Sequence, residues 1–340
     1  MEALTNVVVS ERLGPLGVEE RRIASRPATS VRSAPLWSTR EIADHAAGAD
    51  VVMIGSVEPF DAAAIAMLGR CQGIVRRGIG WDNIDADAAT AAGILVVNVP
   101  DASVDEVAEH ALAMLLALER RVFQLDRLLR AGVGPQDSGS IDGSRDQIRR
   151  ISELTLAIVG FGRIGRALAR RAIHIYGRIL AVDPTLTAET AADHQVIPAT
   201  LADAARTAHH VSLHTPLQES TRHIIDGQVI GLMQPGTIVV NTARGGLIDE
   251  AALAEALLAG HLGGAGLDVT EQEPLSAQSP LLRAGAVVTG HSASWSRTSR
   301  PELVSKSVEA VLDILDGRTP SSVVNPRVLT SPNLRLGTRT

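Results

Sequence analysis

Short apolar runs alternate with helix-like segments along most of the chain. Between Val51 and Val99 the runs VVMIG and ILVVNV flank alanine-rich stretches. From Leu154 to His291 the runs LTLAIVG, RILAVD, HHVSLH, GTIVVN, GAGLDV and AVVTGH are separated by helical segments such as 250–259. Most of these runs lack polar alternation, which is typical of strands buried on both faces of a helix-covered parallel sheet. The pattern therefore predicts an α/β protein.

Longer helices and loops separate these regions. The sequence Ser103-Val-Asp-Glu106 has the form of a capping box, and apolar residues follow it at helical spacing. Another helix is expected over 302–315. The Gly-, Ser- and Asp-rich stretch 131–147 predicts a loop or linker, and the polar segment 326–340 predicts a loose tail. The pattern does not place the elements within 12–49.

A glycine-rich turn opens the second region. It reads Gly160-Phe-Gly162-Arg-Ile-Gly165, with a strand-like run before it and a helix-like run after it. Such a turn lets a diphosphate approach the backbone and face the N–H groups of the helix. Asp183 ends the next strand, 18 residues after Gly165, where it can accept hydrogen bonds from a ribose. Its charge would repel a 2′-phosphate, so NAD is favoured over NADP.

The predicted nucleotide-binding set in this motif is Gly160, Gly162, Arg163, Ile164, Gly165 and Asp183. About 150 residues precede the turn. This is enough for a domain of its own, since domains have roughly 100–200 residues. These residues are expected to form a substrate domain that faces the cofactor.

Composition excludes several classes of protein. Lys+Arg is 32 and Asp+Glu is 38, so the net charge is −6, and no basic run is present to hold a nucleic acid. Lys306 is the only lysine in the sequence, and no Walker A phosphate loop is found. The single cysteine, Cys71, forbids intrachain disulfides and multi-cysteine zinc sites, and is expected to fill the core. No metal site is predicted.

The expected location follows from the same counts. The apolar stretch 111–118 is too short to cross a bilayer, which takes about 20 residues. The N-terminus carries Glu2 and has no long apolar segment, so no signal peptide is expected. A protein of the reducing cytoplasm is predicted.

Polar side chains follow the strands of the second region. The carboxyl ends of parallel strands meet at one edge of a sheet, so these residues are expected to gather there. An arginine can bind the carboxylate and carbonyl of a 2-keto acid through its planar fork. A histidine beside a carboxylate can give the carbonyl oxygen a proton when hydride reaches the adjacent carbon. The candidates at these strand ends are His214, Thr215, Pro216, Thr242, Ala243, Arg244, Asp268, Glu273 and His291.

Plainer readings stand beside these. Arg244 could be a surface or cap residue, Glu273 a solvated loop residue, and His291 a structural histidine. His214 is expected to order its loop rather than to react. The remaining candidates are read as structural or solvated, namely His110, His209, His210 and Glu271.

The motifs closely resemble the D-2-hydroxyacid dehydrogenase family, and most nearly its phosphoglycerate dehydrogenase and C-terminal-binding-protein branches. They are RRGIGWDNID, NVPDASVDEVAEHALAMLLALERR, VGFGRIG, AVDP, LHTPL, NTARGGLIDE, GLDVTEQEP and HSAS after VVT, in order between about Val51 and Pro326. The resemblance implies two doubly wound parallel-sheet domains. A Rossmann NAD domain, residues 103–292, would be inserted into a flavodoxin-like substrate domain, residues 1–102 with 293–340.

The resemblance also implies roles. Arg244 would bind the substrate, His291 would be the acid/base, and Glu273 its partner. Asp268 would hold the nicotinamide end, while Thr215-Pro216 and Thr242-Ala243 would line the cofactor. Substrate contacts would come from the loop residues Arg76, Gly78 and Ile79. Members usually form homodimers through the NAD domain, and a small 2-hydroxy or 2-keto acid would be the substrate.

Departures from the family pattern leave alternatives open. Gly290 replaces the usual proline before the histidine, and Ile54-Gly-Ser-Val57 lacks the arginine that phosphoglycerate-binding members tend to carry. The alternative from another class is an NAD(H)-sensing binding protein like the co-repressor branch. A second enzymatic alternative is oxidation of a different small anion on the same scaffold.

Overall fold

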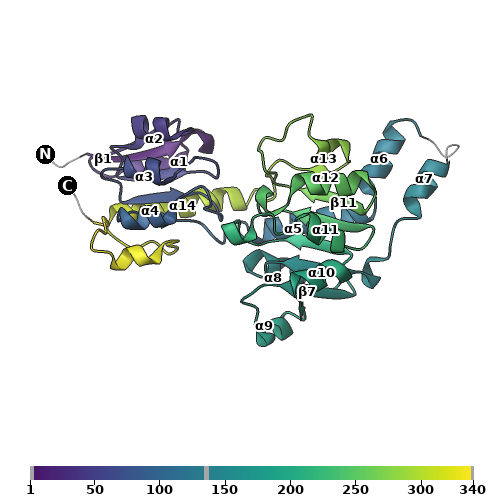
Figure 1. The fold of residues 1–340 in the computed structure, drawn as a ribbon. Coiled ribbons are helices and arrows are strands. Elements are labelled where there is room, and N and C mark those ends of the chain that lie inside the picture. Colours follow the sequence, from purple (N-terminus) through teal and green to yellow (C-terminus); the bar gives the residue numbers. More distant parts are fainter. Residues whose placement is uncertain (1–3, 134–137, 338–340) are drawn as a thin grey trace. The chain divides into compact units, whose positions relative to one another are not determined.

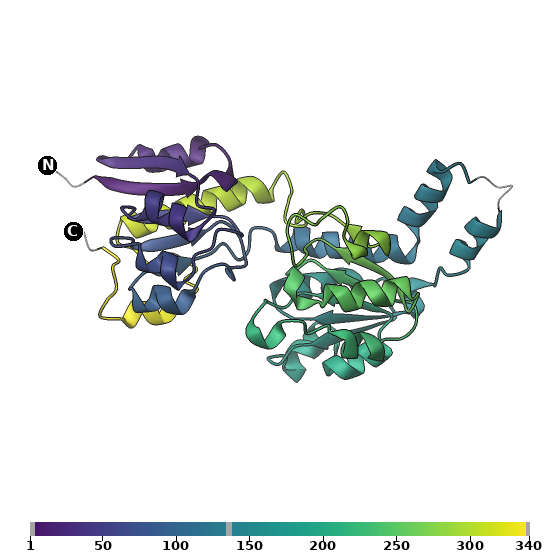
Figure 2. The same ribbon diagram turned by 45° about the horizontal axis from the view of Figure 1, so that its top comes forward.

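The computed structural model describes residues 4–133 and 138–337. Within them the chain divides into two compact units, Met1–Ser103 with Ser296–Thr340 (the first unit) and Val104–Trp295 (the second unit). Each unit is a parallel sheet covered by helices (Figures 1 and 2). The prediction of an α/β protein with parallel sheets is confirmed.

The first unit has its strands in the order β2-β1-β3-β4-β5, all parallel. Apolar side chains on both faces of the sheet are buried, which explains the unbroken apolar runs. Cys71 lies in this core, where burial raises the pKa of its thiol to about 12, so it fills space as predicted. The elements are β1 (Thr5–Ser10), η1 (Glu11–Leu13), α1 (Val18–Ala24), β2 (Thr29–Ala34), α2 (Thr39–Ala46), β3 (Val51–Ile54), α3 (Ala62–Ala66), β4 (Gly73–Arg76), α4 (Ala86–Ala91), β5 (Leu95–Val97), α14 (Ser299–Leu315) and η6 (Pro326–Thr330).

The second unit has the strand order β12-β11-β10-β9-β6-β7-β8, again parallel. The order reverses between β6 and β9, and in open sheets ligands bind beyond the carboxyl ends of the strands at such a point. Its elements are α5 (Val104–Glu119), α6 (Val122–Arg130), α7 (Ser138–Arg145), η3 (Ile151–Glu153), β6 (Thr155–Val159), α8 (Arg163–Ala172), β7 (Arg178–Val182), α9 (Ala188–Asp193), β8 (Ile197–Pro198), α10 (Leu201–Thr207), β9 (His210–Leu213), η4 (Glu219–Thr221), α11 (Gly227–Leu232), β10 (Thr237–Asn241), η5 (Gly245–Leu247), α12 (Glu250–Leu258), β11 (Leu262–Leu267), α13 (Pro280–Arg283) and β12 (Val287–Val288).

Two sequence expectations need correction. The stretch 131–147 is not a plain linker, because Ser138–Arg145 forms α7; residues 134–137 lie outside the described residues. The tail is not loose up to residue 337. Val328 is fully buried, and Arg335 donates hydrogen bonds to the carbonyls of Gly93 and Leu68. Backbone acceptors and a buried apolar side chain hold this polar segment in place.

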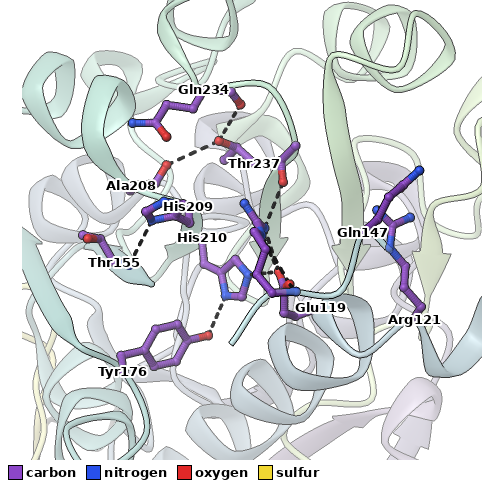
Figure 3. A network of polar contacts seen from close by, with 12 residues as sticks. Glu119, Arg121, Gln147, Thr155, Tyr176, Ala208, His209, His210, Gln234 and Thr237 are labelled. Carbon is purple, nitrogen blue, oxygen red and sulfur yellow. Dashed lines mark hydrogen bonds and ion pairs between the residues drawn. The ribbon is translucent and has the colours of Figure 1, made fainter. Parts of the chain in front are cut away.

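Helices α6 and α7 project from the sheet of the second unit as an arm, residues 120–148 (Figures 1 and 2). A buried polar cluster closes its base (Figure 3). Glu119 precedes the arm, and its carboxylate accepts hydrogen bonds from the backbone N–H of Arg149 at 2.7 Å and from the guanidinium of Arg149 at 2.6 Å. We call this pair the clasp.

His210 and Tyr176 extend the clasp into the core. His210 Nε2 lies 2.9 Å from Glu119 Oε2, and His210 Nδ1 lies 2.6 Å from the Tyr176 hydroxyl. Burial lowers the pKa of His210, so the ring is neutral, donating to the carboxylate and accepting from the phenol. Burial alone would raise the pKa of Glu119, but its bonds to His210 and Arg149 lower it to about 2. The prediction that His210 is structural fits this network.

Candidate active site

The glycine turn lies at the carboxyl end of β6, and β6 is buried along its whole length. Gly160 has φ of +93°, and a Cβ on it would lie 2.5 Å from the backbone of His214 and Thr215. Only glycine fits here. At Gly162, by contrast, a Cβ would meet nothing within 4 Å, and no side chain caps the start of α8. The first N–H groups of α8 thus have open space before them, as binding of a diphosphate requires.

Asp183 follows β7 and is tied to the same turn. Its Oδ2 accepts a hydrogen bond from the N–H of Phe161 at 2.8 Å, and its Oδ1 accepts from the N–H and hydroxyl of Thr185. Partial burial would raise the pKa of Asp183, but these hydrogen bonds outweigh it and lower the pKa. The carboxylate is therefore charged at neutral pH and stands where the sequence motif places the ribose.

Unpaired polar atoms mark the neighbouring strand ends. Within the described residues, His214 Nδ1 and the hydroxyl of Thr242 are buried with no hydrogen-bond partner. The other nitrogen of His214 contacts the Ser212 hydroxyl at 2.8 Å, and burial lowers the pKa of this histidine to about 3. Buried polar atoms without partners are rare, so these two indicate a polar ligand at this edge. The ring nitrogen of His214 and the hydroxyl of Thr242 are groups that can hydrogen-bond to a dinucleotide.

Arg244 follows β10 with its backbone fixed. Asn241 Nδ2 donates to the carbonyl of Arg244 at 2.7 Å, and Asn241 Oδ1 accepts from the N–H of Ala243 at 3.0 Å. Nη1 of Arg244 donates to the carbonyl of Ala243 at 2.6 Å. Asn241 is fully buried, so the strand end that carries the guanidinium is rigid.

His291 and Glu273 form a pair on the loops after β12 and β11. Nδ1 of His291 lies 2.9 Å from Oε2 of Glu273, and both side chains are about one-third exposed. Gly290 and His291 have φ of +60° and +59°. Left-handed backbone costs a residue with a Cβ about 1–2 kcal/mol, so other contacts must hold His291 in place.

Asp268 supplies those contacts. Its Oδ1 accepts from the Thr289 hydroxyl at 2.5 Å and the N–H of Ser292 at 2.8 Å, and its Oδ2 accepts from the N–H of Ala293 at 3.0 Å. Its backbone carbonyl accepts from the N–H of His291 at 2.5 Å. The nicotinamide contact expected for Asp268 stays a prediction; the contacts it makes are to the His291 loop.

Sequence reasoning missed His110, which lies on α5. Its Nε2 is 2.9 Å from the Thr289 hydroxyl and 3.7 Å from Asp268 Oδ1. These partners are more than 150 residues away in sequence, so no local motif points to them. Glu271, read from the sequence as structural or solvated, pairs with His223 at 2.7 Å.

The predicted substrate contacts of the first unit lie at the end of β4, where Arg76 is the last residue of the strand and Gly78 and Ile79 follow it. Arg76 is buried, its Nη1 donates to the carbonyl of Arg77 at 3.0 Å, and its guanidinium fills the space beside Gly78. The carbonyl of Ile79 accepts from Asn98 Nδ2 at 2.7 Å. Arg77 is paired with Glu20 at 2.6 Å. The substrate role of Arg76, Gly78 and Ile79 stays a prediction.

Two other kinds of site find no support. In the parts of the chain that the structure describes, no group of three or more His, Cys, Asp or Glu side chains could hold a metal ion. Nor does any helix among the described residues have the length and apolarity needed to cross a membrane.

Comparison with known proteins decides the family. The family model described as D-isomer specific 2-hydroxyacid dehydrogenase, NAD binding domain, matches residues 112–293. The chain belongs to this family. The resemblance read from the sequence motifs is confirmed, and the matched region holds the glycine turn, Arg244, Glu273 and His291.

Several dehydrogenases are similar to this family member. The (S)-sulfolactate dehydrogenase of Chromohalobacter salexigens is 38% identical over 259 residues, which is 76% of this chain and 82% of that protein. The D-3-phosphoglycerate dehydrogenase of Mycobacterium tuberculosis is 37% identical over 82% of this chain but only 51% of that protein. The chain thus spans about half the length of that relative.

Among solved structures, the TT0316 protein from Thermus thermophilus is similar, with a TM-score of 0.81 and 32% identity. The match covers 94% of this chain and 100% of the Thermus chain. The fold of this family member, with a parallel sheet in each unit, is therefore the fold of a solved protein over nearly its whole length.

Proposed function

We propose that the protein is an NAD-dependent oxidoreductase that interconverts a D-2-hydroxy acid and its 2-keto acid. The observation that carries this is the contact between His291 and Glu273, 2.9 Å apart, on the strand edge that also carries the glycine turn and Arg244. A proton donor, a carboxylate-binding cation and a dinucleotide turn are the parts that reduction of a 2-keto acid needs.

The reaction divides among these residues. When bound, NADH supplies the hydride that reaches C2 of the keto acid. Arg244 binds the substrate carboxylate and carbonyl through two parallel N–H donors and holds C2 in place. His291 donates a proton to the carbonyl oxygen as negative charge develops there, and Glu273 stabilises the imidazolium that must be present beforehand. In the oxidation direction His291 accepts the same proton.

The proposal includes a preference for NAD over NADP. Asp183 is charged, and Pro184-Thr185 beside it offers no cation for a 2′-phosphate. Gly160, Gly162, Arg163, Ile164 and Gly165 would hold the diphosphate, with Thr215, Pro216, Thr242, Ala243 and Asp268 along the rest of the cofactor. Equal rates with NADH and NADPH at low concentration would contradict the role given to Asp183.

The first unit would contact the substrate through Arg76, Gly78, Ile79 and the loops 55–60 and 77–83. These loops are joined, since Phe60 N–H donates to the carbonyl of Asn83 at 2.9 Å. They expose Val57 and Trp81, while their one cation, Arg77, is buried against Glu20. An uncharged substituent on the substrate is therefore favoured over a phosphorylated one.

The proposal also includes a homodimer formed through the second unit, in the cytoplasm. The arm exposes Val122, Phe123 and Leu129 on α6. A cavity of about 690 Å³ lies at its base near the amino ends of the strands, lined by Leu118, Arg127, Gln147 and Leu262 among others. A second copy of the chain is the occupant proposed for this apolar surface. The single, buried cysteine suits a reducing compartment.

A screen of 2-keto acids with NADH tests the function, using apolar, phosphorylated and sulfonated substituents side by side. We expect turnover of at least one acid, with loss of NADH absorbance and formation of the D isomer. Absence of turnover across the set would count against an enzyme. The relatives from Chromohalobacter salexigens and Mycobacterium tuberculosis named above are both dehydrogenases, so the co-repressor alternative gains no support from them.

A further inference from the structure

His110 on α5 and the Thr289 hydroxyl form a hydrogen-bonded chain that ends at the carboxylate of Asp268. The hydroxyl of Thr289 has one hydrogen. It lies 2.5 Å from Asp268 Oδ1, which as a carboxylate can only accept, so the hydroxyl donates there. The Thr289 oxygen must then accept from His110 Nε2–H, 2.9 Å away. The hydrogen bond that Thr289 donates to Asp268 therefore determines that His110 is the donor to Thr289.

Asp268 also binds the backbone of His291 and of the two residues after it. The carboxylate is almost completely buried and accepts the N–H groups of Ser292 and Ala293, directly after His291. Its own carbonyl accepts the N–H of His291. The segment 289–293 is therefore wrapped around one residue of the neighbouring strand end, with Thr289 at its start.

The backbone conformation at Gly290 and His291 requires such stabilising contacts. Gly290 and His291 are both left-handed, at φ of +60° and +59°, and glycine leaves residue 290 free to rotate. Nothing in the local sequence would hold an imidazole in this conformation. The bonds from Asp268 do so, and the rotamer of Thr289 decides whether Asp268 Oδ1 accepts a second hydrogen bond besides the one from the N–H of Ser292.

We propose that His110 and Thr289 are positioning residues for the acid/base step, acting through Asp268 on the place of the His291 imidazole. This rests on the proposed function. Neither side chain is assigned contact with substrate or cofactor. Loss of the chain would leave the imidazole in the protein but misplaced relative to Glu273 and the carbonyl oxygen.

The test compares His110→Phe, Thr289→Val and Thr289→Ser. Small displacements of a catalytic group lower rates strongly, so His110→Phe and Thr289→Val should lower kcat between about tenfold and a hundredfold. Thr289→Ser keeps the hydroxyl and should stay within about twofold of wild type. KM for NADH should change little. His174→Gln, an exposed histidine after α8, is the matched control and should behave as wild type.

A double-mutant cycle separates positioning from general damage. In a His291→Ala background there is no imidazole to misplace, so adding His110→Phe should leave the residual rate unchanged. A merely structural His110 would lower the residual rate by the same factor as in wild type. That equal factor, or full activity in Thr289→Val, would overturn the proposal.

NMR of ring protons gives a readout that does not need turnover. Titration of the His291 Hε1 resonance should shift in His110→Phe and Thr289→Val and match wild type in Thr289→Ser. If wild type turns over no 2-keto acid, the proposed function fails while this titration still decides the positioning role. An unchanged His291 titration in both disabled variants would refute that role.

Discussion

Arg244 is the residue to which the proposed function assigns binding of the substrate carboxylate and carbonyl. Its backbone is held by the buried Asn241, so a side-chain substitution changes the charge and donors without moving β10. We expect Arg244→Ala to lower kcat/KM for the keto acid by about a hundredfold or more, as loss of a charge-assisted pair implies. Arg244→Lys should restore only part of it, because an ammonium lacks the planar fork. Steady-state kinetics of both variants check this; full activity in the lysine variant would argue against bidentate binding.

The His291–Glu273 contact carries a separate prediction. His291→Ala should lower turnover by about 10²–10⁴-fold, the usual range for a general acid–base group. Glu273→Gln keeps the shape but removes the charge that stabilises an imidazolium, so keto-acid reduction should fall by a smaller factor. NADH affinity, measured by fluorescence titration, should stay near wild type in both. Full activity of His291→Ala would leave the binding-protein alternative ahead.

The positions of some residues of the candidate site could be predicted from the sequence, and the position of His110 could not. Arg244, Glu273 and His291 were found from the sequence because each follows a parallel strand, and such strands end at a common edge. His110 could not be found this way. Its partner Thr289 lies 179 positions on, and only the packing of α5 against β10 and β11, next to β12, brings the two together.

At the level of elements, the glycine turn distinguishes two kinds of glycine. A Cβ at Gly160 would strike backbone of the β9 loop, whereas a Cβ at Gly162 meets open space. Gly160→Ala should therefore lower the melting temperature and weaken NADH binding together. Gly162→Ala should leave the melting temperature near wild type but weaken NADH binding by about tenfold or more, since its Cβ would occupy the position proposed for the diphosphate. Equal melting temperatures for the two variants would contradict this reading.

The clasp predicts how stability depends on pH. Glu119 has a folded pKa of about 2, below its ordinary 4.5, so its stabilisation is complete above pH 4.5 and is lost as pH falls towards 2. His210 acts in the same direction, because burial lowers its pKa. Glu119→Gln should lower the free energy of unfolding at pH 7 by about 3 kcal/mol.

Urea unfolding at pH 7 and pH 3 measures this effect. The difference in the free energy of unfolding between wild type and Glu119→Gln should be smaller at pH 3 than at pH 7. As a control, Glu153→Gln removes the exposed partner of Arg150 and should change stability by less than about 0.5 kcal/mol. A gap of the same size at both pH values would show that the charge of Glu119 is not what stabilises the clasp.

Helix α7 shows where local sequence reasoning failed among the elements. Its sequence, SGSIDGSR, consists mostly of residues with low helix propensity and reads as a linker. The segment is helical because it packs against α6 and buries Ile141. The core strands, in contrast, are fixed by apolar runs that need no distant partner to be recognised, and all of the predicted runs form strands.

At the scale of the whole molecule, the arm should decide the state of assembly. Phe123→Asp with Leu129→Asp places two charges on the exposed face of α6, and we expect the proposed dimer to dissociate to monomers. Light scattering after size-exclusion chromatography measures the mass. Ile197→Asp charges an exposed apolar residue on β8, at the other side of the sheet, and should leave the dimer intact. A wild-type monomer, or a dimer that survives the α6 charges, would exclude this surface.

The clasp has one more consequence, for the length of the chain. Glu119 and Arg149 flank residues 120–148 and are hydrogen-bonded to each other. The chain therefore leaves the second unit for the arm and returns to it at the same place. Adding, trimming or exchanging residues within the arm shifts the register of no strand and moves no residue of the nucleotide turn. A lineage of such proteins can therefore change its arm, and with it the surface proposed for dimer contact, without rebuilding the proposed active site at the carboxyl ends of the strands.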